Sequence, residues 1–257
     1  MIKSPLKLAT LFTLATIIGH ANAAQVDLIT FEPVDGYLPD GSLAVDNAAI
    51  TTQYRAQYGV SFGLDADNNL EIDSGSTLRL EDTSNTNGNW GYVSTLAEEE
   101  YNNAESGYES QLGDWFLTND RDGEVSDTIL IQYDNPVTQA SGEIWDIDGR
   151  TNGNSEQWQV SAYDQSGNLL ENIESPIGVH NSVEGSLDSK PWLWSFDVGS
   201  GQQIMKITMQ AIGNVGRSPV AFNNFATASV GAPEPQFWAM LTCFGLISLF
   251  VHRRRTA

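Results

Sequence analysis

The chain has 257 residues and a formal net charge of −21, which results from 33 acidic and 12 basic side chains. Five of the basic residues lie in the two terminal segments, so seven remain between residues 24 and 232. Because binding to a nucleic-acid backbone needs a basic face, this composition excludes a nucleic-acid binder. It also argues against docking on anionic lipid, and it suits a protein that collects divalent cations.

The cysteine content and the length limit the chemistry of the central region. The only cysteine, Cys243, lies in the C-terminal apolar segment. Residues 24–232 therefore offer no disulfide, no cysteine ligand for zinc and no thiol nucleophile. The whole chain has 40% hydrophobic residues, and residues 24–232 are long enough for one large domain or two small ones that fold on their own core.

The first 23 residues are typical of a secretory signal peptide. Lys3 and Lys7 form a charged start, an apolar run follows over residues 8–19, and Ala21-Asn22-Ala23 has the small-x-small pattern of a cleavage site. A transmembrane helix is the alternative, but the run is too short to span a bilayer. We therefore expect export by the Sec route.

The region that follows is predicted to be all-β. It shows no sustained 3.6-residue apolar stripe, and its short apolar segments alternate with polar residues. Ten strands are predicted, at residues 26–31, 58–64, 77–81, 128–133, 140–147, 157–163, 169–173, 192–198, 204–211 and 220–228. Asp164 to Asn168 is predicted to be a hairpin turn. Short strands joined by polar turns predict a single β-sandwich of jelly-roll type.

One long segment, residues 83–115, lacks any clear period and is rich in Asn, Gly, Ser, Glu and Tyr. Such segments in compact domains are typically functional or mobile. Trp90, Tyr92 and Trp115 are candidates for stacking against sugar rings, with neighbouring amides and carboxylates accepting hydroxyl hydrogen bonds. The alternative is that these rings pin the segment to the domain.

The remaining tryptophans of the region lie on predicted strands. Trp145 and Trp158 alternate with apolar neighbours, so we expect them in the core. Trp192, Trp194 and Phe196 share one strand face, which is predicted to be core rather than a sugar platform.

Catalytic motifs are largely missing between residues 24 and 232. His180 is the only histidine there, and no G-x-S-x-G pattern occurs, which argues against a Ser-His-Asp triad and against histidine-based metal sites. No phosphate-binding loop occurs. Paired carboxylates carry little information among 32 acids, so a glycan-cleaving enzyme stays an alternative and we predict a protein that is not an enzyme.

Three local stretches collect the oxygen ligands that calcium prefers. They are Asp65–Asp73, Asp120–Glu124 and Asp146–Glu156. The first opens like an EF-hand loop but has Leu70 at the position of the glycine and Ser76 at that of the final glutamate, so it is not an EF-hand.

The third stretch follows a predicted strand end. If Trp145 and Ile147 face the core, Asp146 and Asp148 share the outer face, and the chain returns to Glu156 beside them. These three carboxylates are therefore predicted metal ligands, with a solvated polar turn as the alternative at each stretch.

A fourth candidate metal site combines residues far apart in the sequence. Glu32 ends the first predicted strand in a Phe-Glu pair, and Asn223 and Asn224 lie in the last one, before Phe225. This pattern resembles jelly-roll carbohydrate-binding and discoidin-like modules, which often hold a structural calcium where their first and last strands meet. The resemblance implies calcium ligands at these three positions, although Asn stands where Asp is more usual, which would weaken the hold on the ion.

The C-terminal segment, residues 233–257, has three parts in a fixed order. They are the motif Pro233-Glu234-Pro235, the apolar run 237–251, and the cluster Arg253, Arg254, Arg255. As a helix the run would measure about 22 Å, which is shorter than the roughly 30 Å of a hydrocarbon core. The arginines favour a cytoplasmic C-terminus.

This order resembles the PEP-CTERM sorting signal. The resemblance implies recognition of Pro233-Glu234-Pro235 by an exosortase, a transient anchor of residues 237–251 in the inner membrane, and delivery to the cell surface or extracellular matrix of a Gram-negative bacterium. A permanent single-pass anchor is the alternative.

The expected organisation is a signal peptide at 1–23, a β-sandwich domain at 24–232 and the sorting signal at 233–257. The function predicted from it is that of an exported, non-catalytic protein with a calcium-supported β-sandwich that binds extracellular polysaccharide. A structural matrix component without a specific ligand and a glycan-active enzyme are the alternatives.

Overall fold

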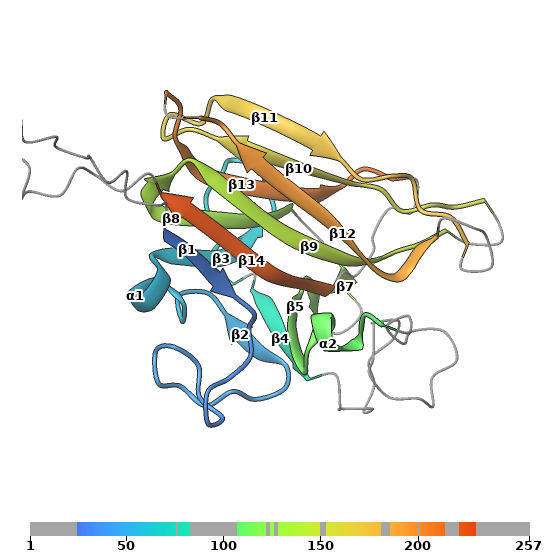
Figure 1. The fold of residues 1–257 in the computed structure, drawn as a ribbon, viewed down its shortest axis with the longest axis horizontal. Coiled ribbons are helices and arrows are strands. Elements are labelled where there is room, and N and C mark those ends of the chain that lie inside the picture. The colour runs from blue at the N-terminus through green and yellow to red at the C-terminus, as the bar shows by residue number, and fades with distance from the viewer. Residues whose placement is uncertain are drawn as a thin grey trace, which may run out of the picture. The chain divides into compact units, whose positions relative to one another are not determined.

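Two antiparallel β-sheets lie face to face in the computed structural model of the chain (Figure 1). The structure describes residues 25–75, 77–82, 107–121, 124–125, 128–149, 153–180, 186–199, 201–213 and 221–229. All of them belong to the unit formed by residues 24–231. The predicted signal peptide, the sorting motif and the apolar run 237–251 lie outside the described residues.

The larger sheet has seven strands. In spatial order they are β12 (Leu187–Asp197), β9 (Gln139–Ile147), β14 (Ala221–Ser229), β5 (Trp115–Thr118), β4 (Leu78–Asp82) and β2 (Ala48–Ile50), with β1 (Gln25–Ile29) also paired to β14. β14 pairs with β1 over residues 225–229 and with β5 at residues 221–222. Because β14 pairs with both strands, the residues that follow β1 lie close to the start of β5.

The smaller sheet has five strands. Their order is β11 (Leu169–Glu174), β10 (Trp158–Tyr163), β13 (Ile204–Ala211), β8 (Thr128–Val137) and β3 (Val60–Asp65). A short pair, β6 (Asp120–Arg121) and β7 (Glu124–Val125), and two four-residue helices, α1 (Arg55–Tyr58) and α2 (Glu109–Leu112), complete the described elements. Within the described ranges, neither helix has the length and apolar character needed to cross a membrane.

The main core fills the space between the two sheets. Phe62 of β3 and Phe225 of β14 meet edge to face with ring centroids 5.6 Å apart, and both side chains are fully buried. Successive side chains of a β-strand point to opposite faces, so every second side chain of a strand faces this layer. The six residues of β3 are nevertheless all buried, because both faces of that strand are covered. Trp158, Trp194 and Phe196 are buried in the main core as predicted.

A second, smaller cluster lies on the other face of the larger sheet. It contains Trp145 with Leu112, Phe116 and Ala221. Asp146 adopts a left-handed φ of 69°, which interrupts the alternation of β9. Trp145 and Ile147 consequently belong to different clusters, and the expectation that they face one core is corrected.

All ten predicted strands are present, with ends displaced by a few residues. The prediction at 58–64 begins too early because Tyr58 ends α1 and β3 starts at Val60. The turn from Asp164 to Asn168 joins β10 to β11 as a hairpin, as predicted. The sequence patterns missed β2, β5 and the β6–β7 pair, which are two to four residues long and too short to show a period.

Candidate functional site

The chain after β1 and the start of β14 meet at one segment, residues 111–115, which joins α2 to β5. Glu32 accepts hydrogen bonds at Oε1 from the backbone N–H groups of Asp114, at 2.7 Å, and Trp115, at 3.0 Å. Asn223 donates from Nδ2 to the carbonyl oxygen of Leu112 and to that of Trp115. We call this meeting of Glu32, residues 111–115 and residues 223–224 the junction. Glu32 and Asn223, which the non-local pattern paired as calcium ligands, both contact residues 112–115, and their assignment as metal ligands stays a prediction.

Asn224 connects the junction to a buried carboxylate. Its Nδ2 lies 2.8 Å from the carbonyl oxygen of Gln111 and 2.8 Å from Oε2 of Glu143. Glu143, only 6% exposed, also accepts from Nε2 of Gln111 at 2.7 Å and from the indole N–H of Trp145 at 3.1 Å. The sequence patterns did not single out Glu143, because two of its three partners, Gln111 and Asn224, come from remote parts of the chain and nothing local separates it from the other acids.

The junction gathers several oxygen atoms of the kinds that a hard cation takes as ligands. It gathers a carboxylate, two side-chain amides and the carbonyl oxygens of residues 111, 112 and 115, and oxygen is the ligand that calcium takes. Burial is the main cause that raises the pKa of the Glu32 carboxyl above its usual value. The two backbone N–H donors, of Trp115 and Asp114, lower this pKa and so offset part of the effect of burial. A nearby cation would favour the charged carboxylate. The Nδ2 groups of Asn223 and Asn224 face the carbonyl oxygens of the segment. To act as calcium ligands, the two side-chain amides would each turn by half a rotation, so that Oδ1 faces the ion.

Gly113 is required for the close approach of Glu32. Its φ is +75°, and a Cβ built on it would lie 2.2 Å from Glu32 Oε1. Any other residue would push the carboxylate away from the N–H groups of Asp114 and Trp115. The junction therefore depends on one glycine as well as on its polar side chains.

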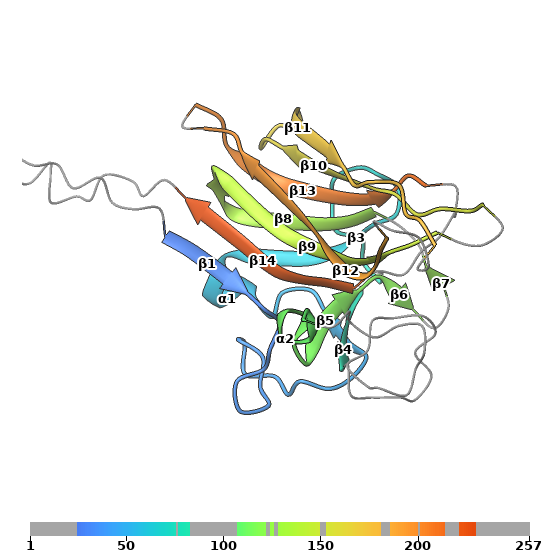
Figure 2. The ribbon, with the colours of Figure 1, turned by 45° about the vertical axis from the view of Figure 1, so that its right-hand side comes forward.

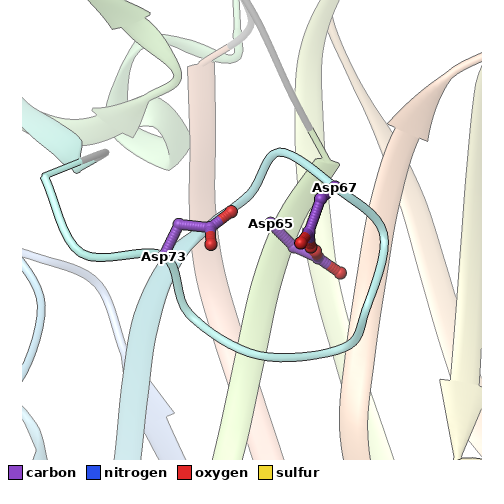
Figure 3. A group of neighbouring side chains, drawn as sticks. All are labelled: Asp65, Asp67 and Asp73. Atoms are coloured by element: carbon purple, nitrogen blue, oxygen red, sulfur yellow. The ribbon is translucent and has the colours of Figure 1, made fainter.

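A group of three carboxylates lies in the loop after β3 (Figure 3). Asp65, Asp67 and Asp73 each offer an oxygen within 4.8 Å of the other two, and no other group of three His, Cys, Asp or Glu side chains comes so close among the residues that the structure describes. We call residues 65–73 the acidic loop. It coincides with the first of the predicted oxygen-rich stretches.

The acidic loop satisfies its carboxylates with its own backbone. Asp65 is buried and accepts from the N–H groups of Asn69, at 3.0 Å, and Leu70, at 2.9 Å. Asp73 accepts from the N–H of Ala66 at 2.6 Å. These bonds explain the closeness of the carboxylates without an ion, since a loop of this sequence folds back on itself.

The third predicted stretch is arranged differently from the expectation. Glu156 is buried, and its Oε2 accepts from the N–H of Asp148 at 3.3 Å. The backbone N–H of Glu156 in turn donates to the carbonyl oxygen of Asp148 at 2.9 Å. Asp146, Asp148 and Glu156 are all described, yet they do not bring three ligand atoms within 4.8 Å of one another. Glu156 therefore bonds to the backbone of Asp148, the residue that directly follows β9.

The aromatic candidates divide into two groups. Trp90 and Tyr92 lie outside the described residues. Trp115 is half-buried and packs against the main core, and Glu32 holds its backbone N–H. This packing of Trp115 agrees with the alternative in which its ring holds residues 83–115 against the domain.

A hollow of about 300 Å³ lies on the larger sheet where β9, β12 and β14 run side by side. Its lining includes Gln139, Ser141, Ser195, Asp197, Ala226 and Thr227. Cross-strand register places Ser195, Ser141 and Ala226 in one row of small side chains. Gln139 donates from Nε2 to Asp197 Oδ2 at 2.9 Å beside this row. No sequence pattern pointed to this hollow, because small polar residues at alternate positions are typical of any solvated strand.

The comparisons with known proteins give structural likenesses alone. No family model and no curated protein matches the chain. The K2 cleaved adhesin domain of Lys-gingipain is similar in structure, with a TM-score of 0.41 and 10% identity over 79% of this chain and 99% of that one. A DUF4465 family protein from Bacteroides caccae has a TM-score of 0.40 and 14% identity, over 79% and 98% of the two chains.

A third similar structure is the CBM22-1 xylan-binding domain of Paenibacillus barcinonensis Xyn10C. Its TM-score is 0.28 and its identity 12%, and the match covers 82% of this chain and 98% of that one. At these TM-scores none of the three enters the functional argument.

Proposed function

We propose that the chain is an exported, non-catalytic cell-surface or extracellular-matrix protein whose β-sandwich, of jelly-roll type, binds polysaccharide with the support of calcium. The observation that carries the binding function is the hollow on the larger sheet. Ser141 and Ser195 offer hydroxyls, Gln139 an amide and Asp197 a carboxylate, all beside a row of small side chains. Sugar hydroxyls both donate and accept hydrogen bonds, so they need such a mixed set of partners.

Calcium belongs to the proposal because of the junction. Glu32, Asn223 and the carbonyl oxygens of Leu112 and Trp115 form an oxygen-rich set at the point where the first and last strands approach each other. An ion held there would tie β14 to the segment before β5 and would stabilise the folded state in which these ligands meet.

The destination of the protein rests on the two ends of its sequence. A signal peptide at residues 1–23 and a PEP-CTERM-like tail at residues 233–257 support export, exosortase as a processing partner and a transient stay in the inner membrane. Their pattern also supports delivery to the surface or matrix of a Gram-negative bacterium.

Binding in solution tests the proposal. The full-length protein is titrated with soluble neutral and anionic polysaccharides, once with millimolar calcium and once with EDTA. We expect saturable binding to at least one polymer, and at least a tenfold loss with Ser195→Arg, which fills the exposed row of the hollow. Asn172→Arg, at an exposed position of β11 in the other sheet, is the matched control and should bind normally.

Two outcomes would replace this proposal. A folded protein that binds none of the polymers, but associates with them through calcium without saturation, would favour a structural matrix component, which the net charge of −21 would suit. Turnover of a polysaccharide that disappears with a single carboxylate variant would favour a glycan-active enzyme.

A further inference from the structure

The chain between β1 and β2 forms a small structured excursion, residues 33–45, which extends away from the two sheets (Figures 1 and 2). Val34 and Tyr37 exchange backbone hydrogen bonds of 3.0 Å in both directions. Between them, Asp35 and Gly36 have φ values of 54° and 83°, which is the backbone of a type I′ hairpin turn. The excursion is therefore held by regular backbone pairing.

A second pairing adds a third short segment to the excursion. Leu38 donates from its N–H to the carbonyl oxygen of Ser42 at 2.8 Å, and Ala44 donates to that of Gly36 at 2.9 Å. These bonds flank Tyr37 and Leu43, which are direct cross-strand partners. In such a pair, which carries no hydrogen bonds of its own, the two side chains lie close together on one face.

The excursion buries one face and exposes the other. Leu38 is 4% exposed and belongs to the main core, so it anchors the excursion to the sandwich. On the other face, Val34 is 76% exposed, Tyr37 51% and Leu43 59%. Because Tyr37 pairs with both of the others, the three side chains form one row, which we call the apolar row. A solvent-facing row of large apolar side chains on a hydrogen-bonded backbone is typical of an interaction surface.

The size and charge of this surface restrict its partner. Three side chains are few against the roughly 20–30 residues that each partner contributes to a stable protein interface. Asp35 and Asp40 stand in the turns beside the row, and the whole chain carries a net charge of −21. A second copy of the chain or an anionic polymer would therefore be repelled. A neutral polymer would not be.

We propose that the apolar row, centred on the ring of Tyr37, is a stacking platform for a neutral polysaccharide. The C–H face of a sugar ring lies flat on an aromatic ring, Val34 and Leu43 extend the apolar contact on either side, and the carboxylates of Asp35 and Asp40 accept hydroxyl hydrogen bonds at the edge. This inference rests on the proposed function, and it names a second surface, separate from the hollow, and the class of ligand that the surface takes.

Affinity electrophoresis of the full-length protein tests the platform. The probes are soluble galactomannan, xylan and mixed-linkage β-glucan, each cast into the gel, with alginate as the anionic comparison. We expect retardation by at least one neutral probe, about a tenfold weaker apparent affinity with Tyr37→Ala, and retained affinity with Tyr37→Trp. Leu169→Ala, which removes a side chain of similar exposure, 53%, from β11, is the matched control and should migrate as the native protein does.

The outcomes separate this inference from the proposed function. Unchanged binding by Tyr37→Ala, while Ser195→Arg abolishes it, would overturn the platform and leave the hollow as the binding surface. No retardation by any probe would overturn both. A dimer in sedimentation equilibrium that Val34→Asp dissociates would assign the apolar row to a second copy of the chain and would also overturn the platform.

Discussion

The acidic loop and the junction both concentrate oxygen ligands, but they do so by different routes. In the acidic loop, three carboxylates within nine residues accept N–H groups of the same loop, so short-range folding is enough to gather them. In the junction, Glu32, the segment 111–115 and Asn223 come from distant parts of the chain and meet only when β14 pairs with β1 and β5. Closeness of carboxylates in a local turn therefore says little about an ion, whereas an ion at the junction would be coupled to folding.

The largest expected effect is that of Asn223→Ala. This side chain is 1% exposed and donates to the carbonyl oxygens of Leu112 and Trp115, which would lose their partner inside the protein. We expect a loss of about 2–4 kcal/mol in the free energy of unfolding, measured by denaturant titration. Asn69→Ala in the acidic loop, at an exposed position, is the control and should cost less than about 1 kcal/mol. Equal losses would remove the distinction between the two regions.

The next largest expected effect is stabilisation by calcium, which should depend on the junction and not on the acidic loop. If the junction binds the ion, calcium at a hundred times its Kd should stabilise the protein by about 2.7 kcal/mol, and EDTA should reverse this. Glu32→Gln should abolish the gain in melting temperature, while Asp67→Asn should leave it intact. The opposite pattern would place the ion in the acidic loop instead.

A variant that adds one negative charge sharpens the calcium test. Asn223→Asp would set a carboxylate against the carbonyl oxygens of Leu112 and Trp115, so we expect a less stable protein in EDTA. Calcium should restore that stability, because the new carboxylate would be a stronger ligand than the amide. A variant that calcium does not rescue would argue against a cation at the junction.

Substitution of two glycines by alanine should cause losses of stability of intermediate size, and the two losses can be compared directly. Gly113 in the junction and Gly75, just after the acidic loop, have φ values of +75° and +93°, so alanine at either position costs about 1–2 kcal/mol. Only at Gly113 would the new Cβ also displace the Glu32 carboxylate, whereas nothing lies within 4 Å at Gly75. Thermal unfolding should therefore show a larger drop for Gly113→Ala than for Gly75→Ala, and equal drops would mean that the Glu32 hydrogen bonds contribute little.

The smallest expected effect concerns a second local acidic turn. The side chain and backbone of Asn168 hold the pKa of Asp164 below its usual 3.8. A lowered pKa in the folded state means that the stability from this group is present above that value and is lost as the pH falls through the folded pKa. Asp164→Ala should slightly lower the melting temperature at neutral pH, and the difference from the native protein should shrink as the pH falls below 3.8 and through the lowered pKa of the folded state. A difference independent of pH would point to loss of turn geometry rather than of charge.

Local sequence patterns were enough to predict the all-β character, the positions of ten strands and the turn at residues 164–168. The same local patterns placed Trp158 and Trp194 in the core. Each of these features depends on a period of two or on turn residues, which neighbouring positions impose on one another. The Phe-Glu and Asn-Asn-Phe patterns also pointed to the pairing of first and last strands, through a resemblance.

Which side chains share a face or a site depends instead on how the strands pair and pack. Cross-strand register brought Ser195, Ser141 and Ala226 into one row. The packing of remote segments gathered three partners around the buried Glu143, and the left-handed Asp146 separated Trp145 from Ile147. Packing likewise turned Tyr37 outward while Leu38 entered the core. Such choices depend on contacts between strands that are remote in the sequence, and a one-residue change of register would reverse every one of them.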